Sequence, residues 1–126
     1  MKILSSPAIR NSVWLTVPFN FVAAGALGLP DSVLGRLVAL PPTNSLYATF
    51  VGFLVALFGA AYIWIALQKT IPKPQLCFGA IGKIGVFLIV TVFFIRGQAS
   101  WRLWAASSGD LVLGSYWLAW IVRERT

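Results

Sequence analysis

Two ionisable side chains fall inside long apolar stretches of the sequence, and they are the residues best placed to do chemistry. Lys83 lies within residues 76–95, and Asp110 lies within residues 103–122. A charged side chain at the centre of a bilayer costs at least about 2.5–3.5 kcal/mol on insertion scales, so each needs a partner or a function. One interpretation is an intramembrane ion pair, or a proton-accepting site that lines a cavity. In a second interpretation, the long aliphatic side chain of Lys83 extends until its ammonium group reaches the lipid headgroups. Asp110 then accepts a hydrogen bond from Ser107, a Trp indole or another helix.

The heights of these two residues in a helical hairpin bear on the choice. In an antiparallel hairpin that turns near residue 98 or 99, Lys83 lies level with about residue 114, and Asp110 lies about 6 Å further along the axis. Side chains lean toward the N-terminus of their own helix, which tips Lys83 and Asp110 apart. A direct ion pair therefore depends on the long lysine stem, and Tyr116 is a nearer partner for Lys83.

Catalysis needs more groups than these two. Acid–base chemistry usually requires a second titratable group at hydrogen-bond range. Ser107 and Ser108 precede Gly109-Asp110, but the sequence has no His to serve as their base. With no His and a single Cys, Cys77, the chain also lacks the side chains that ligate haem, copper, zinc or iron–sulfur clusters. We expect no catalytic or metal-binding residues, and no cofactor other than a bound lipid or pigment.

The composition indicates that lipid surrounds most of the chain. Of its 126 residues, 59% are apolar and 10% are charged, whereas soluble domains have about 45–50% apolar and about 25% charged residues. A soluble core could not bury this much apolar surface. The net charge of +7 does not indicate a nucleic-acid partner, because almost all of the basic residues lie between the apolar runs and they form no patch. We therefore expect an integral membrane protein.

Four segments are long enough to cross about 30 Å of hydrocarbon as helices. They are residues 13–29, 46–68, 76–95 and 103–122. Pro18 then falls in the opening turns of the first span, where its missing amide donor costs little. Residues 31–40 show helical periodicity and end at a double proline, which predicts a short helix in the membrane interface. The predicted fold is an all-α, four-helix membrane bundle that forms one domain over residues 1–126.

Basic residues in the flanks of the spans predict the orientation. Six lie on the side that holds both termini, and three lie on the other side. The six are Lys2, Arg10, Lys69, Lys73, Arg123 and Arg125, and the three are Arg36, Arg96 and Arg102. This bias favours both termini in the cytoplasm. Trp101 and Trp104 at one end of the last span, and Trp117 and Trp120 at the other, are expected to form aromatic belts at the two interfaces.

Each predicted span has one small or polar face, and these faces are expected to meet inside the bundle. Small residues in membrane helices let two backbones approach closely. The glycines expected at such contacts are Gly52, Gly59, Gly79, Gly82, Gly85 and Gly114. The polar side chains expected inside the membrane are Lys83, Asp110, Asn20, Tyr62 and Tyr116.

Several short stretches together resemble a known group of proteins. They are FNFVAAG at 19–25, LPDSVLGR at 29–36, FGAAY at 58–62, GKIGVF at 82–87 and SGDL at 108–111. In this order and spacing they resemble the small four-helix bacterial membrane proteins of the BphX-like or DoxX-like type. The resemblance implies a four-helix bundle in the bacterial inner membrane. Some DoxX-like members are associated with terminal oxidases or redox complexes, which implies an accessory role for this chain, since it cannot hold a redox centre itself.

Three functions remain open. The first is a non-catalytic accessory or structural subunit that packs against membrane lipids and other membrane proteins, or against itself, in a larger assembly. The second is a small transporter or permeation protein in which Lys83 and Asp110 line a polar interior. The third is a protein that binds a lipid-soluble compound such as a quinone, carotenoid or sterol-like molecule, with Tyr62 or Trp64 needed to retain it. We favour the first.

Overall fold

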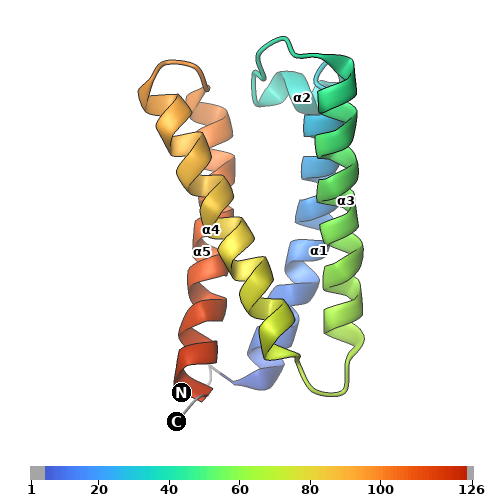
Figure 1. Ribbon diagram of the computed structural model, residues 1–126, viewed down its shortest axis with the longest axis vertical. Helices are drawn as coiled ribbons and strands as arrows, with labels where there is room; N and C mark the ends of the chain where they lie inside the picture. The colour runs from blue at the N-terminus through green and yellow to red at the C-terminus, as the bar shows by residue number, and fades with distance from the viewer. Residues whose placement is uncertain (1–4, 125–126) are drawn as a thin grey trace.

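Five helices make up the part of the chain that the computed structural model describes, residues 5–124, and no strand occurs in it (Figure 1). In chain order they are α1 (Ser6–Gly28), α2 (Val33–Leu37), α3 (Ser45–Leu67), α4 (Lys73–Ile95) and α5 (Trp101–Glu124). The all-α prediction is confirmed for these residues. Lys2 and Arg125, two of the basic residues that predict the orientation, lie outside them.

The first helix begins earlier than predicted, at Ser6 instead of residue 13. The side chain of Ser5 caps it by accepting a hydrogen bond from the backbone N–H of Ala8 at 3.3 Å. Pro18 consequently lies in the helix interior, so its predicted place in the opening turns is wrong. A proline there has no N–H to donate to the preceding turn.

The short connecting helix is also shorter than predicted, because α2 covers Val33–Leu37 and not residues 31–40. Ser32 caps its start by accepting a hydrogen bond from the backbone N–H of Gly35 at 3.3 Å. The helix ends before Ala39, whose positive φ of 53° lies in the left-handed region. The two prolines that follow, at positions 41 and 42, lack the N–H groups that a continuing helix needs.

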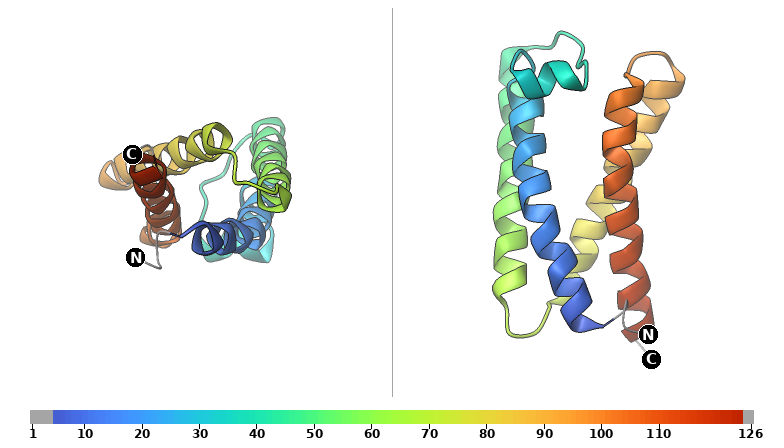
Figure 2. Two further views of the ribbon diagram at one scale, coloured as in Figure 1. Left: turned by 90° about the horizontal axis from the view of Figure 1, so that it is seen from below. Right: turned by 180° about the vertical axis from the view of Figure 1, so that it is seen from behind.

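The long helices pack as two hairpins, α1 with α3 and α4 with α5 (Figure 1). The start of α1, the end of α5 and the α3–α4 connection lie at one end of the molecule. The two hairpins meet at this end and diverge toward the other end (Figures 1 and 2). There the segment after α2 reaches the α5 hairpin, because the hydroxyl of Ser100 donates to the Val38 carbonyl.

An arginine joins the start of α1 to the end of α3 within the first hairpin. The guanidinium of Arg10, on α1, donates to the backbone carbonyls of Ala66 and Gln68, the latter at 2.7 Å, and to that of Lys69 at 3.1 Å. The last carbonyls of a helix have no partner within it and carry a partial negative charge. Arg10 therefore satisfies the C-terminal end of α3.

Glycines set the closest approaches within each hairpin. A Cβ added to Gly52 would lie 2.6 Å from the Cα of Gly28, and one added to Gly114 would lie 2.8 Å from the carbonyl oxygen of Ala80. Helix backbones thus touch directly at both positions.

Two further predicted glycine contacts involve aromatic rings. An added Cβ would lie 3.1 Å from the Phe21 ring at Gly59 and 2.9 Å from the Tyr62 side chain at Gly79. At Gly82 and Gly85 an added Cβ would meet nothing within 4 Å. The predicted close packing is therefore wrong for these two glycines within the described chain, because no described part of another helix lies close to their backbone.

Helices α3 and α4 are long and apolar enough to cross a membrane. The core helix of a soluble protein has similar composition but is mostly buried, whereas only 28% and 17% of the apolar stretches of α3 and α4 are buried here. The chain therefore exposes its two most apolar helices, which is the surface expected of a membrane-associated protein. Helices α1 and α5 contain more polar residues and fall short of the same criterion.

Candidate functional site

The most buried charged group joins three helices. The Nζ atom of Lys83 on α4 donates to Oδ1 of Asp110 on α5 at 2.9 Å and to Oδ1 of Asn20 on α1 at 3.2 Å. The side chains of Lys83 and Asp110 are only 4% and 14% exposed. Lys83 therefore forms the direct ion pair and does not extend to the headgroups.

The expectation that Lys83 and Asp110 tip apart is wrong, and the lysine stem is the reason. Gly114 packs against Ala80 and Ile84, so the backbone of Lys83 is level with Gly114. Asp110 lies about one helical turn from Gly114, toward the α4–α5 connection. An extended lysine side chain is long enough to cover about one helical turn, 5.4 Å. The alternative hydroxyl partner of Asp110, Ser107, instead donates to the carbonyl of Trp104 at 2.8 Å.

Three aromatic rings complete the surroundings of the ammonium group. The Nζ atom of Lys83 lies 5.2 Å from the ring centroid of Phe19, 5.3 Å from that of Tyr62 and 5.9 Å from that of Trp117. Cation–π attraction acts over about 6 Å and is strongest where water is excluded. We call Lys83, Asp110, Asn20 and these three rings the lysine cluster.

Sequence reasoning missed the roles of Phe19 and Trp117. The sequence feature that points to Trp117 is its spacing, because it follows Asp110 by seven residues and so shares a helix face with it.

Trp117 is fully buried and Trp120 is 3% exposed, so the predicted aromatic belt at this end is wrong. Trp117 is tolerated inside because its Nε1 donates to the hydroxyl of Ser12 at 2.8 Å.

Asn20 connects the lysine cluster to the remaining long helix. Its Nδ2 donates to the carbonyl oxygen of Val55 on α3 at 3.0 Å, while its Oδ1 accepts from Lys83. The residue is 7% exposed. All four long helices are thus joined through one polar network.

The two tyrosines differ in their surroundings. Tyr62 is 3% exposed, and its hydroxyl donates a long hydrogen bond of 3.5 Å to the carbonyl of Gly79. Tyr116 is half-buried and packs against the apolar core that contains Trp117 and Trp120.

A cavity of about 240 Å³ adjoins the lysine cluster between the two hairpins, and we call it the interhairpin cleft. Side chains of all four long helices line it. Its walls are Phe19, Asn20, Ala23, Leu27, Val51, Leu54, Val55, Phe58, Tyr62, Gly82, Lys83, Val86 and Asp110. The cluster can hold the hairpins together at one end of this cleft and present polar atoms to whatever enters it.

Comparisons of the chain with protein-family models, with curated proteins and with solved structures found no match. The resemblance to BphX-like and DoxX-like proteins stays a prediction, and the case for a function rests on the geometry of the lysine cluster and the interhairpin cleft.

Proposed function

We propose that the chain is a non-catalytic subunit of a larger assembly in the bacterial inner membrane, with four spanning helices and both termini in the cytoplasm. The exposed apolar surfaces of α3 and α4 support insertion. Helices α1 and α5 lie alongside them over a similar length, so the same apolar layer would contain all four (Figure 1). At the end proposed as cytoplasmic, the described basic residues are Arg10, Lys69, Lys73 and Arg123.

The open wall of the interhairpin cleft carries the proposal. Val51, Leu54 and Val86 line it and are 42%, 50% and 46% exposed, and Gly82 among them has nothing within 4 Å of an added Cβ. In membrane proteins, small residues such as glycine are enriched at positions where another helix packs. Within the described chain no helix fills this wall, so we assign it to a helix of a partner protein.

The lysine cluster has a structural role in this account. The ammonium group of Lys83 already has two oxygen acceptors and three aromatic rings around it. Such a cluster fixes the angle between the hairpins and so keeps the cleft open for the partner.

Photo-crosslinking in the native membrane tests this function. A benzoyl-phenylalanine is placed at Leu54 or Val86 in the cleft, and at Phe53 or Leu88 as controls. The control positions are also exposed, at 62% and 56%, but do not line the cleft. We expect the cleft positions to crosslink to one protein that mass spectrometry identifies, and the controls to crosslink to lipid. Equal protein crosslinking from all four positions would contradict an interface at the cleft.

Permeation is the second candidate, because Lys83, Asp110 and Asn20 all line the interhairpin cleft. It is tested with the purified chain in liposomes, where ion or proton flux is compared with that of the double variant Lys83→Met/Asp110→Leu. The subunit function predicts no flux above the double variant. A flux that the double variant loses would favour permeation instead.

A further inference from the structure

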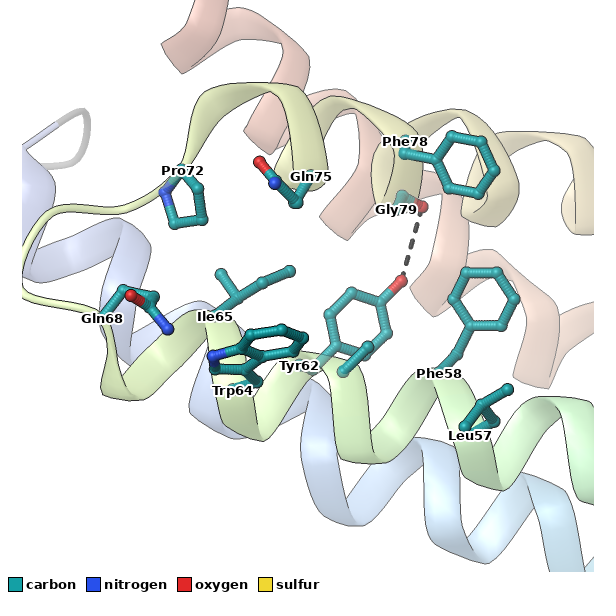
Figure 3. A pocket seen from close by; sticks show the side chains of 11 residues that line it. Leu57, Phe58, Tyr62, Trp64, Ile65, Gln68, Pro72, Gln75, Phe78 and Gly79 are labelled. Carbon is teal, nitrogen blue, oxygen red and sulfur yellow. Dashed lines mark hydrogen bonds between the residues drawn. The ribbon is translucent and has the colours of Figure 1, made fainter.

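A second cavity adjoins the interhairpin cleft, and Phe58 and Tyr62 line both. This groove, of about 470 Å³, runs between the C-terminal half of α3 and the first turns of α4 (Figure 3). Its volume falls in the range of about 300–1,000 Å³ that is usual for small-molecule sites. Tyr62 and Gly79 hold the two helices together beside it, whereas Trp64 and Phe78 are 71% and 68% exposed. The groove is therefore accessible from outside the helix pair, where lipid would lie.

The two ends of the α3–α4 groove differ in chemistry (Figure 3). At one end the rings of Phe58 and Phe78 face each other from α3 and α4, with planes 7° apart and centroids separated by 6.4 Å. At the other end lie the carboxamides of Gln68 and Gln75, near Pro72. A ligand that fills the groove thus meets aromatic surface along its body and amide groups at its head.

The polar end lies where the membrane surface would be. Gln68 caps the C-terminal end of α3, and Gln75 is in the first turn of α4. The groove therefore runs from the headgroup level into the apolar layer, in the direction in which an amphiphilic lipid lies.

The head of the ligand is expected to be neutral. None of the 11 residues that line the groove is charged. Two nearby cations are engaged elsewhere, since Lys73 holds its ammonium 5.7 Å from the Trp120 ring and Arg10 donates to the carbonyls that end α3. A carboxamide both donates and accepts hydrogen bonds, which suits a hydroxyl or a carbonyl group.

We propose that the α3–α4 groove binds a neutral lipid with a flat ring and a hydroxyl or carbonyl head. The ring and chain lie against Phe58, Trp64 and Phe78, and the head lies between Gln68 and Gln75. The site requires α3 and α4 to lie in a membrane, as in the function proposed above, but it requires no partner protein.

Photolabelling of the purified chain in phosphatidylcholine nanodiscs tests this site. The probe is para-dodecylphenol with a diazirine in its chain, and labelled peptides are mapped by mass spectrometry. Ala61 lines the groove, so Ala61→Phe fills it, while Ala60→Phe adds the same ring at the exposed neighbouring position, which does not line it. We expect labelling that excess unlabelled para-dodecylphenol displaces. It should fall about tenfold in Ala61→Phe and stay within about twofold in Ala60→Phe, since tenfold in affinity is about 1.4 kcal/mol.

A second variant tests the head group and does not depend on a large side chain. Gln68→Leu/Gln75→Leu keeps the shape of the groove and removes both amides. We expect para-dodecylphenol to displace the probe about tenfold less well from this variant than from the wild type. Dodecylbenzene, which lacks the hydroxyl, should displace it poorly from the wild type.

Two results would overturn the groove site. One is equal labelling of the Ala60 and Ala61 variants after both elute as the wild type does in size-exclusion chromatography. The other is equal displacement by dodecylbenzene and para-dodecylphenol, which would mean that any acyl chain occupies the groove. If Ala61→Phe does not fold, the glutamine variant decides. Neither readout depends on the crosslinks from the interhairpin cleft, so the two proposals fail separately.

Discussion

Lys83 keeps an ammonium group inside the molecule by replacing its water shell with protein groups. Asp110 supplies a charged acceptor at 2.9 Å, Asn20 supplies a neutral one at 3.2 Å, and three aromatic faces cover the remaining sides. The desolvation cost of a buried ion pair offsets much of its attraction, but an unpaired buried charge is far more costly. The pair therefore specifies how the hairpins meet more than it adds to stability.

The difference in cost between a buried ion pair and an unpaired buried charge gives a prediction for Lys83 and Asp110. Lys83→Met alone or Asp110→Leu alone leaves one buried charge without its partner, and each should lower the free energy of unfolding by about 3–5 kcal/mol. The double variant removes both charges and should unfold close to the wild-type temperature. Thermal unfolding in mild detergent measures this, with Lys69→Met at an exposed loop position as the control. If the double variant is less stable than either single variant, the charges do not act as a pair.

A second residue-scale prediction concerns the buried indole of Trp117. Its Nε1 donates to the hydroxyl of Ser12 at 2.8 Å. Ser12→Ala removes this acceptor and leaves a buried N–H unpaired, which should cost about 1–3 kcal/mol of stability.

The matched control is Ser108→Ala. Ser108 is exposed, and its hydroxyl donates only within α5, to the carbonyl of Ala105. Its loss should change the unfolding temperature little. Equal shifts for the two serine variants, measured in the same thermal scan, would mean that the bond between α1 and α5 does not contribute.

At the scale of the helices, glycine positions separate contacts within the chain from contacts with a partner. Gly52→Leu should disrupt the α1–α3 hairpin, because a Cβ there already meets the backbone of Gly28 at 2.6 Å. Gly82→Leu should leave the unfolding temperature of the purified chain unchanged, since its surroundings are open, yet reduce recovery of the partner protein. The measurement pairs thermal unfolding with affinity purification from the native membrane.

The control for this pair is Gly85→Leu, where an added side chain is also unobstructed but the residue does not line the interhairpin cleft. It should affect neither stability nor partner recovery. Loss of the partner in the Gly85 variant and not in the Gly82 variant would place the interface on another face of α4.

The sequence predicts most helix positions because the long apolar runs coincide with the long helices. Helix α3 begins at Ser45 and α4 at Lys73, close to the predicted residues 46 and 76. The start of α1 is missed because its first turns are polar. They form a helix since Ser5 caps them and Arg10 binds the end of α3, and neither contact can be read from hydropathy.

The candidate site is predicted in part for a similar reason. Lys83, Asp110 and Asn20 stand out because polar groups are rare in apolar segments. Their pairing does not follow from helix heights, since it depends on the path of the lysine stem. The contribution of Phe19 depends on how α1 packs against the α4–α5 hairpin, which the sequence alone does not show.

At the scale of the whole molecule, the proposed orientation predicts which loop faces the cytoplasm. In a Cys77→Ala background, a cysteine at Lys69 should react with a membrane-impermeant maleimide only after the cells are opened. A cysteine at Gln98, in the connection between α4 and α5, should react in intact cells. The reverse pattern would contradict the predicted orientation, and labelling of both in intact cells would contradict a spanning hairpin.

The most direct test of the subunit function is native mass spectrometry of the protein, extracted from its own membrane in nanodiscs. If the interhairpin cleft holds a partner helix, the mass spectrum of the wild type should show a complex of fixed stoichiometry with another membrane protein. The spectrum of the Gly82→Leu variant should lack that protein. A single monomeric species from the wild type, stable in mild detergent and carrying no other polypeptide, would contradict the proposal.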